Sequence, residues 1–349
     1  MEPDQMHAAY LDSHLSLNYG LVPKPIPRKG QVLIKVEAAP INPSDLHCIE
    51  GKYAEFVDFQ YPFVPGWEGS GTVIESGGGF MGWYLRGKRV AFSKCQEDQE
   101  EGSLIKIGGA YGQYCVTDAR QCVPLPDSVS FEQGSSFFVN PMTAIGMVEI
   151  VSKARSRAVV ITAAASQLGK MMIRLFVRKR ITVIATVRSE SQEKDLRDTF
   201  GLEHIFNTSD DEFLPEFKKT CKEARVKYML ECIGGSICGK LMSNLPKGCN
   251  VLLYGNLSRE AVSDIDCFSF MASEITLKCF KLDVWIASKN IFKLLGIVKK
   301  VKRLIKDNLS SKISRQYHLK DINEAVQYYE ENMSKGKVLL KPWDLEQDY

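Results

Sequence analysis

The segment Ala158-Val-Val-Ile-Thr-Ala-Ala-Ala-Ser-Gln-Leu-Gly169 joins a short β-branched run to a cluster of very small residues. Beyond Gly169 the apolar residues recur with helical spacing as far as Phe176. A buried strand, a tight turn of small residues and a helix N-terminus together make the phosphate-binding turn of dinucleotide-binding folds. The segment therefore predicts a nucleotide site in the middle of the chain.

Strands and helices alternate on the C-terminal side of this turn, which predicts an α/β fold with a doubly wound parallel sheet. The expected strands lie at 158–162, 182–187, 228–232, 250–254 and 275–280, and the expected helices at 168–178, 190–200, 212–224 and 236–245. Residues 6–125 are β-rich instead, with short strands bounded by Gly or Pro, as in Gln31-Val-Leu-Ile-Lys-Val-Glu-Ala. The charged segment 94–108 is expected to be a surface loop.

Length and composition indicate a soluble protein of two domains. The chain has 349 residues, of which 44% are hydrophobic and 25% are charged, and its formal net charge is +3. This balance gives no reason to expect nucleic acid as a partner, and no apolar run is long enough for a membrane-spanning helix. Residues 1–7 have neither the apolar core of a signal peptide nor the character of a transit peptide. A cytoplasmic location is expected, with the mitochondrial matrix as the alternative.

The ten cysteines are scattered, and none forms a Cys-x-x-Cys pair. This distribution is typical of reduced thiols, and not of a disulfide framework or a structural zinc site. The basic segment 289–306 permits two interpretations. It is either a membrane-surface or partner-binding helix, or an ordinary amphipathic helix with a solvated basic face. The narrow apolar stripe favours the second interpretation.

The three glycine positions of a dinucleotide-binding turn read Ala163, Ser166 and Gly169, so only the third glycine is present. Alanine and serine still allow a phosphate to approach, and the Ser166 hydroxyl can donate to it. Ser166, Gln167 and Leu168 begin the helix, whose free N–H groups and dipole favour an anion. We expect these three residues to contact the cofactor.

The second expected strand ends in Thr186-Val-Arg-Ser-Glu190. No carboxylate stands at its tip, where NAD-dependent enzymes hold the ribose hydroxyls. Arg188, with Ser189 beside it, suits a 2′-phosphate instead, so NADPH is the expected cofactor.

Six ordered motifs make the chain resemble the medium-chain dehydrogenase/reductase superfamily over nearly its whole length. They are Ile41-Asn-Pro-Ser-Asp45, Pro62-Phe-Val-Pro-Gly-Trp-Glu-Gly69, Gly87-Lys-Arg-Val-Ala91, Gly109-Ala-Tyr-Gly112, Asn140-Pro-Met-Thr-Ala144 and Gly336-Lys-Val-Leu-Leu340. The resemblance implies a GroES-like β-rich catalytic domain, residues 1–132 with 284–349, and a Rossmann domain, residues 133–283.

Residue types at the metal positions of that superfamily argue against catalytic zinc. Asn42 and Trp67 stand where the alcohol dehydrogenases have Cys and His, and neither side chain is a normal zinc ligand. The resemblance therefore points to the zinc-independent branch, whose members reduce activated double bonds in enoyl thioesters, quinones or enones.

Within that branch the chain is most similar to the 2-enoyl thioester reductases, where Tyr53 matches a tyrosine placed beside the substrate. Its hydroxyl is expected to stabilise an enolate or relay a proton. The resemblance also implies that Asn42 lies near the nicotinamide. Further expected cofactor contacts are Asn140, Thr143, Gly234, Tyr254, Gly255 and Lys337.

The expected substrate pocket includes Trp67, Phe280 and Lys281. Those reductases usually show Gly-Phe-Trp where this chain has Cys279-Phe-Lys281, so the pocket wall differs. The strand near 275–280 resembles the strand through which these Rossmann domains pair, so the resemblance implies a homodimer. The expected partner is a small-molecule substrate. Two alternatives remain open: a quinone or enone reductase, and a catalytically silent member that serves as a structural subunit.

Overall fold

The computed structural model describes residues 5–53, 61–94, 109–210 and 212–343. These residues form two compact units, one made of 1–141 with 298–349 and the other of 142–297. Two helices, α4 (Val139–Lys153) and α11 (Ile291–Leu304), each begin in one unit and continue into the other. The unit boundaries therefore fall inside helices and lie further along the chain than the expected 132/133 and 283/284.

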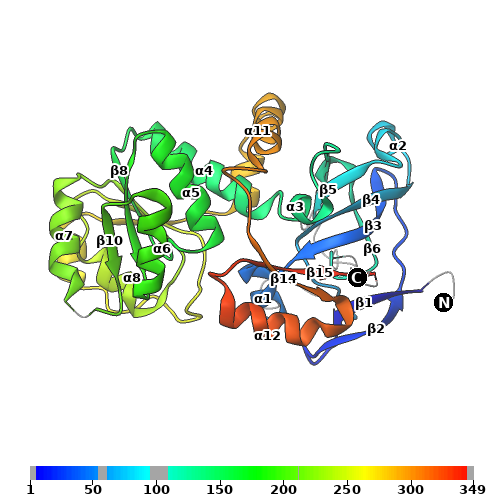
Figure 1. Ribbon diagram of the computed structural model, residues 1–349, viewed down its shortest axis with the longest axis horizontal. Helices are drawn as coiled ribbons and strands as arrows, with labels where there is room; N and C mark the ends of the chain where they lie inside the picture. Colours follow the sequence, from blue (N-terminus) through cyan, green and yellow to red (C-terminus); the bar gives the residue numbers. More distant parts are fainter. Residues whose placement is uncertain (1–4, 54–60, 95–108, 211, 344–349) are drawn as a thin grey trace. The chain divides into compact units, whose positions relative to one another are not determined.

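The first unit is built on a sheet in the order β14-β15-β3-β4-β5-β7, with β6 also paired to β3, and on a separate β1-β2 hairpin (Figure 1). Strands from both ends of the unit therefore share one sheet, since β15 pairs antiparallel with β3. Its strands and helices are β1 (Gln5–Leu11), β2 (Leu17–Pro23), β3 (Gln31–Pro40), α1 (Pro43–Ile49), β4 (Glu68–Ser76), α2 (Phe80–Leu85), β5 (Arg89–Ser93), β6 (Tyr114–Asp118), β7 (Cys122–Pro124), α3 (Phe131–Ser135), β14 (Ile313–His318), α12 (Ile322–Asn332) and β15 (Lys337–Lys341).

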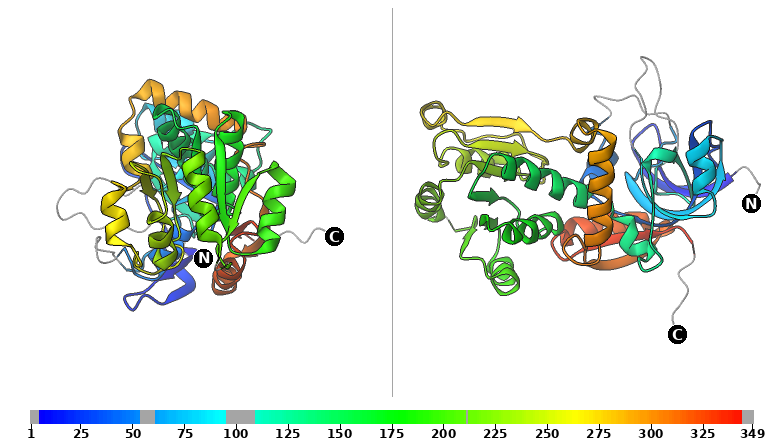
Figure 2. Two further views of the ribbon diagram at one scale, coloured as in Figure 1. Left: turned by 90° about the vertical axis from the view of Figure 1, so that its left-hand side faces the viewer. Right: turned by 90° about the horizontal axis from the view of Figure 1, so that it is seen from above.

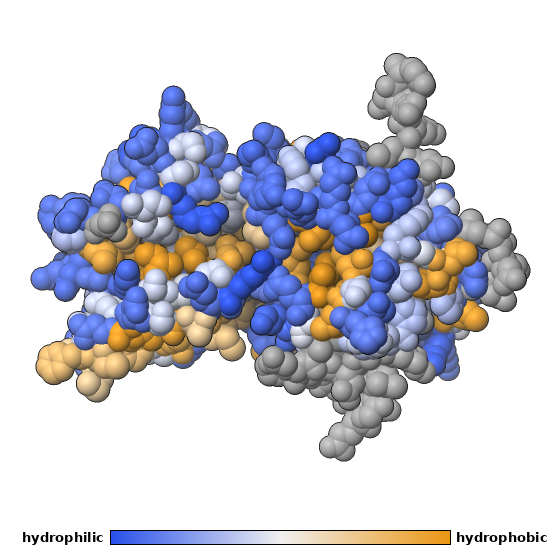
Figure 3. Space-filling model, turned by 90° about the horizontal axis from the view of Figure 1, so that it is seen from below, coloured by the Kyte–Doolittle hydropathy of each residue, from blue (hydrophilic) through white to orange (hydrophobic). Residues whose placement is uncertain are grey.

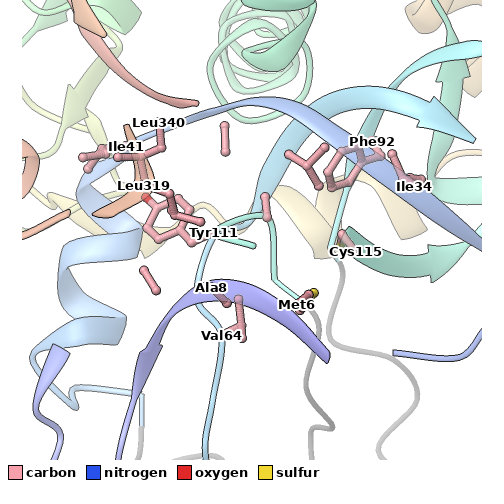
Figure 4. Close-up of a cluster of buried hydrophobic side chains, with 14 of the residues drawn as sticks. Met6, Ala8, Ile34, Ile41, Val64, Phe92, Tyr111, Cys115, Leu319 and Leu340 are labelled. Atoms are coloured by element: carbon pink, nitrogen blue, oxygen red, sulfur yellow. The ribbon is translucent and has the colours of Figure 1, made fainter. Parts of the chain in front are cut away.

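The core of this unit gathers side chains from motifs that are far apart in the sequence. Figure 4 shows Tyr111 beside Ile41, Leu319 and Leu340, and these residues are buried. Glycine permits a further close approach, because a Cβ on Gly109 would lie 2.1 Å from the carbonyl oxygen of Pro65. The motifs at residues 62–69 and 109–112 are thus held side by side.

The second unit contains a six-stranded sheet in the order β10-β9-β8-β11-β12-β13, with every pair parallel. Helices lie on both sides of it (Figure 2, left). The strand order reverses between β8 and β11, the point at which doubly wound sheets bind ligands. Its elements are β8 (Ala158–Ile161), α5 (Gln167–Arg178), β9 (Thr182–Val187), α6 (Glu190–Phe200), β10 (His204–Asn207), α7 (Phe213–Glu223), β11 (Tyr228–Glu231), α8 (Gly235–Met242), β12 (Asn250–Leu253), α9 (Cys267–Ala272), β13 (Thr276–Cys279) and α10 (Leu282–Ala287).

The five strands and four helices expected in this unit are all present, within a few residues of their predicted bounds. One strand, β10, was not expected. The nine described cysteines are all unpaired, as expected of reduced thiols, and the expected loop at 94–108 lies almost wholly outside the described residues. Among the helices that the structure describes, none is both long and apolar enough to span a bilayer.

Candidate functional site

The turn between β8 and α5 has the conformation that its sequence predicts. Ser166 caps α5, its Oγ accepting the N–H of Gly169 at 3.0 Å. The hydroxyl proton of Ser166 stays available to donate, and the first N–H groups of a helix have no partners within it. Gln167 is buried and Leu168 is half-buried at this N-terminus. The turn thus offers hydrogen-bond donors to an anion.

Two backbone features show why small residues occupy this turn. Ala163 stands where the first glycine is expected and adopts a positive φ of 45°, a conformation that favours glycine. A Cβ on Gly169 would lie 2.4 Å from the carbonyl oxygen of Ala164, so that position requires glycine. The alanine at 163 therefore keeps the backbone path of a glycine turn.

Arg188 directly follows β9, as predicted, and its side chain is exposed. No side chain in the described ranges forms an ion pair with its guanidinium group. Ser189 caps α6, with its Oγ accepting the N–H of Gln192 at 3.3 Å and lying 3.0 Å from Ser191 Oγ. A free guanidinium group beside two hydroxyls and a helix N-terminus suits a phosphate group.

The ends of the neighbouring strands hold the other residues predicted in this unit. Gly234 follows β11 with a φ of 75°, and a Cβ there would lie 2.4 Å from Asn256 Oδ1. Gly255 follows β12, where a Cβ would lie 3.1 Å from Cys232 Cβ. Tyr254, beside it, has a buried hydroxyl next to the Cys232 thiol, which is only a weak hydrogen-bond partner. These residues lie at the same edge of the sheet as the α5 turn.

Three buried polar side chains at this carboxyl edge have unused hydrogen-bonding capacity. They are Thr186 at the end of β9, Glu231 at the end of β11 and Tyr254 after β12. Glu231 Oε1 accepts the N–H of Gly234 at 3.0 Å while Oε2 has no partner, and burial raises the pKa of this carboxyl. Unpartnered buried polar groups are rare in proteins and call for an explanation. A polar dinucleotide at the switch point would supply partners, so the residues present fit a dinucleotide cofactor.

In the first unit, Asn42 and Asp45 are fully buried at the start of α1. Asp45 Oδ2 accepts the N–H of Asn42 at 2.8 Å, and Oδ1 accepts the N–H of Trp67 at 3.0 Å. Proline at position 43 suits the first turn of a helix, where its missing N–H is not needed. The Asp45 carboxylate thus links the motif at residues 41–45 to the motif at residues 62–69.

The side chain of Asn42 is held by two charged groups. Its Oδ1 accepts a hydrogen bond from Lys337, and its Nδ2 donates to Glu68 Oε1 at 3.2 Å. Lys337 also donates to the carbonyl oxygen of Ile41 at 3.3 Å. The second carboxylate oxygen of Glu68 accepts the N–H groups of Phe138 and Val139 at 2.9 and 3.0 Å, where α4 begins. Lys337 therefore points into this buried network.

The network contains two carboxyl groups and one ammonium group, all buried. Burial raises the pKa of Asp45 to about 7 and raises the pKa of Glu68, while nearby Lys337 opposes both shifts. Burial also lowers the pKa of Lys337, and the two carboxylates oppose that shift. The single ammonium group is thus the cation that compensates this buried acidic pair.

The raised pKa of Asp45 predicts a pH-dependent stability. The folded state holds the Asp45 proton more tightly than the unfolded state. The contribution of this proton to the free energy of unfolding is therefore complete below about pH 4 and is lost as the pH rises to about 7. Chemical denaturation should show that the free energy of unfolding of the wild type falls by about 2–3 kcal/mol relative to that of Asp45→Asn between about pH 5 and pH 7.

The exposed Asp266 provides the matched control for this measurement. Its pKa is lowered, chiefly by the backbone N–H of Ser269, so it titrates below the tested range. Asp266→Asn should therefore leave the pH dependence of the wild type unchanged. Equal slopes for Asp45→Asn and the wild type would show that Asp45 does not titrate in this range.

Tyr53 lies on a turn after α1 and packs edge-on against Trp67, with ring centroids 5.7 Å apart. Both rings are half-buried and pack on a cluster formed by Leu11, Cys48 and Phe63. The Trp67 indole N–H is buried without a partner. The structure thus brings the predicted catalytic tyrosine and one predicted pocket residue into contact.

The other two predicted pocket residues follow β13. Phe280 packs on Trp285, with centroids 6.4 Å apart, and both rings approach Gly146 of α4. Trp285 is buried and was not predicted, although it supplies a tryptophan beside Phe280. Lys281 is not buried with these two rings: its side chain is 62% exposed and its ammonium lies 3.5 Å from Asp283.

Asn140 and Thr143 lie one turn apart in α4 and are both buried. Asn140 belongs to the first unit and Thr143 to the second, so this helix face carries predicted cofactor residues of both. Three buried acidic residues, Asp45, Glu68 and Glu231, were not predicted. Asp45 and Glu68 stand within quoted motifs, but nothing in the sequence marks them as buried. Within the described ranges, no group of His, Cys, Asp and Glu is suited to holding a metal ion.

Comparison with known families agrees with this arrangement. Residues 28–127 match the alcohol dehydrogenase GroES-like domain. The crystal structure of a candidate NADPH:quinone reductase from Mesorhizobium loti superposes with a TM-score of 0.84 at 28% identity, covering 98% of this chain and all of that one.

Two groups of curated relatives are similar in sequence. The mitochondrial enoyl-[acyl-carrier-protein] reductase of Arabidopsis thaliana is 26% identical over 90% of this chain and 78% of its own length. The quinone oxidoreductase of Pongo abelii is 24% identical over 73% of this chain and 74% of its own. The relatives therefore indicate an oxidoreductase and include both substrate classes.

Proposed function

Because this chain belongs to the medium-chain dehydrogenase/reductase superfamily, we propose that it is an NADPH-dependent reductase of an activated C=C bond, with a 2-enoyl thioester as its substrate. The observation that carries the cofactor assignment is the set of buried polar groups with unused hydrogen-bonding capacity at the carboxyl edge of the parallel sheet, beside the α5 turn and Arg188. Catalytic zinc has no place in this proposal, since Asn42 and Trp67 are not normal zinc ligands.

Each part of the cofactor has residues suited to it in the second unit. The N-terminus of α5, with the Ser166 hydroxyl, would hold the pyrophosphate, and Arg188 with Ser189 would hold the 2′-phosphate. Thr186, Glu231 and Tyr254 supply buried polar atoms with unused hydrogen-bonding capacity near the switch point. NADPH, when bound, supplies the hydride for the reduction.

The chain's own chemical task is to stabilise negative charge on the thioester oxygen and to provide a proton for the α-carbon. Tyr53 supports this role because its ring is half-buried against Trp67 and its hydroxyl can serve as a donor. Asn42 is enclosed, with its amide held by Lys337 and Glu68. One N–H of that amide remains to orient a neighbouring group.

The substrate class is tested by measuring NADPH oxidation with a 2-enoyl thioester and with a quinone. We expect a higher kcat/KM for the thioester. A clear preference for the quinone would leave the cofactor assignment intact and replace the substrate. No turnover with either, in a protein that binds NADPH, would favour the structural-subunit alternative.

Arg188→Ala tests the assignment of the 2′-phosphate. Loss of this charge-assisted hydrogen bond should weaken NADPH binding by about 1.5–3 kcal/mol and leave NADH binding nearly unchanged. Arg180→Ala, on the loop before β9, is a matched control that should affect neither cofactor. Equal losses for both cofactors in Arg188→Ala would remove Arg188 from the recognition of the 2′-phosphate.

We also propose that the protein is a homodimer paired through β13. This strand is the last in the sheet order, and three of its four residues are exposed, Leu277 among them. An exposed apolar edge strand invites pairing with another strand. Light scattering should give twice the monomer mass, whereas a monomer at all concentrations would contradict this proposal.

A further inference from the structure

Four large apolar side chains are exposed on the short helix α2 of the first unit. Phe80 is 79% and Trp83 is 72% exposed, and Met81 and Tyr84 are exposed as well. The helix is anchored by Gly82 and Leu85, which are buried. The face shown in Figure 3 is mainly hydrophilic, with smaller hydrophobic areas. A concentration of exposed aromatic residues on one turn is unusual for a protein surface and marks an interaction site.

A second segment lies against the start of α2. The N–H of Gly30 donates to the carbonyl oxygen of Gly78 at 3.2 Å, and a Cβ on Gly77 would lie 2.0 Å from the carbonyl oxygen of Arg28. The loop between β2 and β3 therefore adjoins the turn before α2. It carries Ile26, which is 80% exposed. The exposed apolar side chains thus come from two adjacent segments.

The charges of these two segments have a single sign. Residues 24–30 and 77–89 contain six Lys and Arg and no Asp or Glu. Arg28, Lys29 and Arg86 are exposed and form no ion pair with any residue that the structure describes. The Lys88 ammonium lies 3.1 Å from the centroid of the Tyr84 ring, and Lys302 of α11 interacts electrostatically with the same tyrosine. Positive charge therefore surrounds the exposed aromatic rings.

We propose that this surface docks the protein on a bilayer that contains anionic phospholipids. The aromatic-basic patch consists of Ile26, Phe80, Met81, Trp83 and Tyr84, together with the basic residues of the same two segments. Trp and Tyr favour the headgroup region, aliphatic and Phe side chains enter the acyl boundary, and Lys and Arg attract anionic headgroups. The protein would lie on the membrane without spanning it.

The positive charge of the aromatic-basic patch favours an anionic bilayer over a second copy of the chain. Two aromatic-basic patches facing each other would bring twelve like-charged residues of the paired segments together, which opposes self-association. A nucleic acid would satisfy the charges and the aromatic rings, but it would leave Ile26 and Met81 without an apolar environment. An anionic bilayer satisfies the aliphatic, aromatic and basic side chains at once.

The experiment is co-sedimentation of the full chain with vesicles of phosphatidylcholine, with and without phosphatidylglycerol. We expect binding that requires phosphatidylglycerol and weakens with salt. Trp83 provides a second readout, because it is the one exposed tryptophan of the four in the chain. Its fluorescence should shift to the blue on binding, and Trp83→Phe should remove the shift.

Substitutions on the aromatic-basic patch should weaken vesicle binding without affecting the fold, because the side chains are exposed. Phe80→Ser with Trp83→Ser should weaken it about tenfold or more. Arg28→Gln with Arg86→Gln should weaken it about 25-fold, since each basic residue near an anionic surface contributes about fivefold. Phe268→Ser on α9 is the matched control, because Phe268 is as exposed as Phe80 and lies in the other unit.

Three results would overturn the proposal. Absence of vesicle binding would do so, as would binding that the Phe80/Trp83 variant retains in full. The third concerns the fluorescence of Trp83. It would be a change from the spectrum of an exposed tryptophan when single-stranded RNA is added, or when the protein concentration is raised, with no change when vesicles are added. Each of these outcomes is independent of NADPH binding and turnover.

Discussion

Lys337→Met should destabilise the first unit by about 3–5 kcal/mol, because it leaves two buried carboxyl groups without the cation that lies near them. Lys337 is 2% exposed and donates to Asn42 and Ile41, while Glu68 and Asp45 lie within electrostatic reach. Methionine keeps the length of the side chain and removes only the charge and the donors. Urea denaturation above neutral pH, where Asp45 is ionised, is the measurement.

Lys335 gives a matched control for that variant. It precedes Lys337 by two residues and is exposed, so Lys335→Met should change the free energy of unfolding by less than about 0.5 kcal/mol. Combining Lys337→Met with Glu68→Gln should recover part of the loss, because the double variant removes both charges. Strict additivity of the two single variants would contradict a charge pair between them.

Tyr53→Phe should reduce turnover about 10- to 1000-fold, the range for loss of one proton donor or oxyanion donor. The substitution keeps the ring, and with it the packing against Trp67 at 5.7 Å. Steady-state kinetics should therefore show a lower kcat with an unchanged free energy of unfolding and unchanged NADPH binding.

Tyr61 is the control for this variant, since it is half-buried and packs on the same cluster of Leu11, Cys48 and Phe63. Tyr61→Phe removes an equivalent hydroxyl and should retain most of the activity. If the two variants lose activity equally, the hydroxyl of Tyr53 has no special role in the reaction.

The second unit was predictable from the sequence because its strands are short apolar runs that end at turns of small residues. The exception, His204-Ile-Phe-Asn207, is an outer strand with one buried residue, so it carries little apolar signal. In the first unit the helix α2 was not predicted. Its sequence Phe80-Met-Gly-Trp-Tyr-Leu85 does not alternate apolar and polar residues with helical spacing, because four of its six residues are apolar and yet exposed.

The candidate site was predictable where backbone geometry demands particular residues. Gly169, Gly234 and the Ser166 cap follow from the close approaches and turns that the fold requires. The buried network was not, because Glu68 and Lys337 are distant in sequence and Glu and Lys are ordinarily surface residues. Their burial follows from the pairing of β15 with β3 and from the proximity of Asn42 to both side chains. Only tertiary structure brings those residues together.

We infer that the turn after β8 still binds NADPH, although two of its three glycine positions are Ala163 and Ser166. Fluorescence titration of the purified protein with NADPH and then with NADH tests it most directly. We expect micromolar binding of NADPH, with a clear preference over NADH. Failure to bind either cofactor would show that the turn has lost its cofactor, and a structural-subunit role would then be the better explanation.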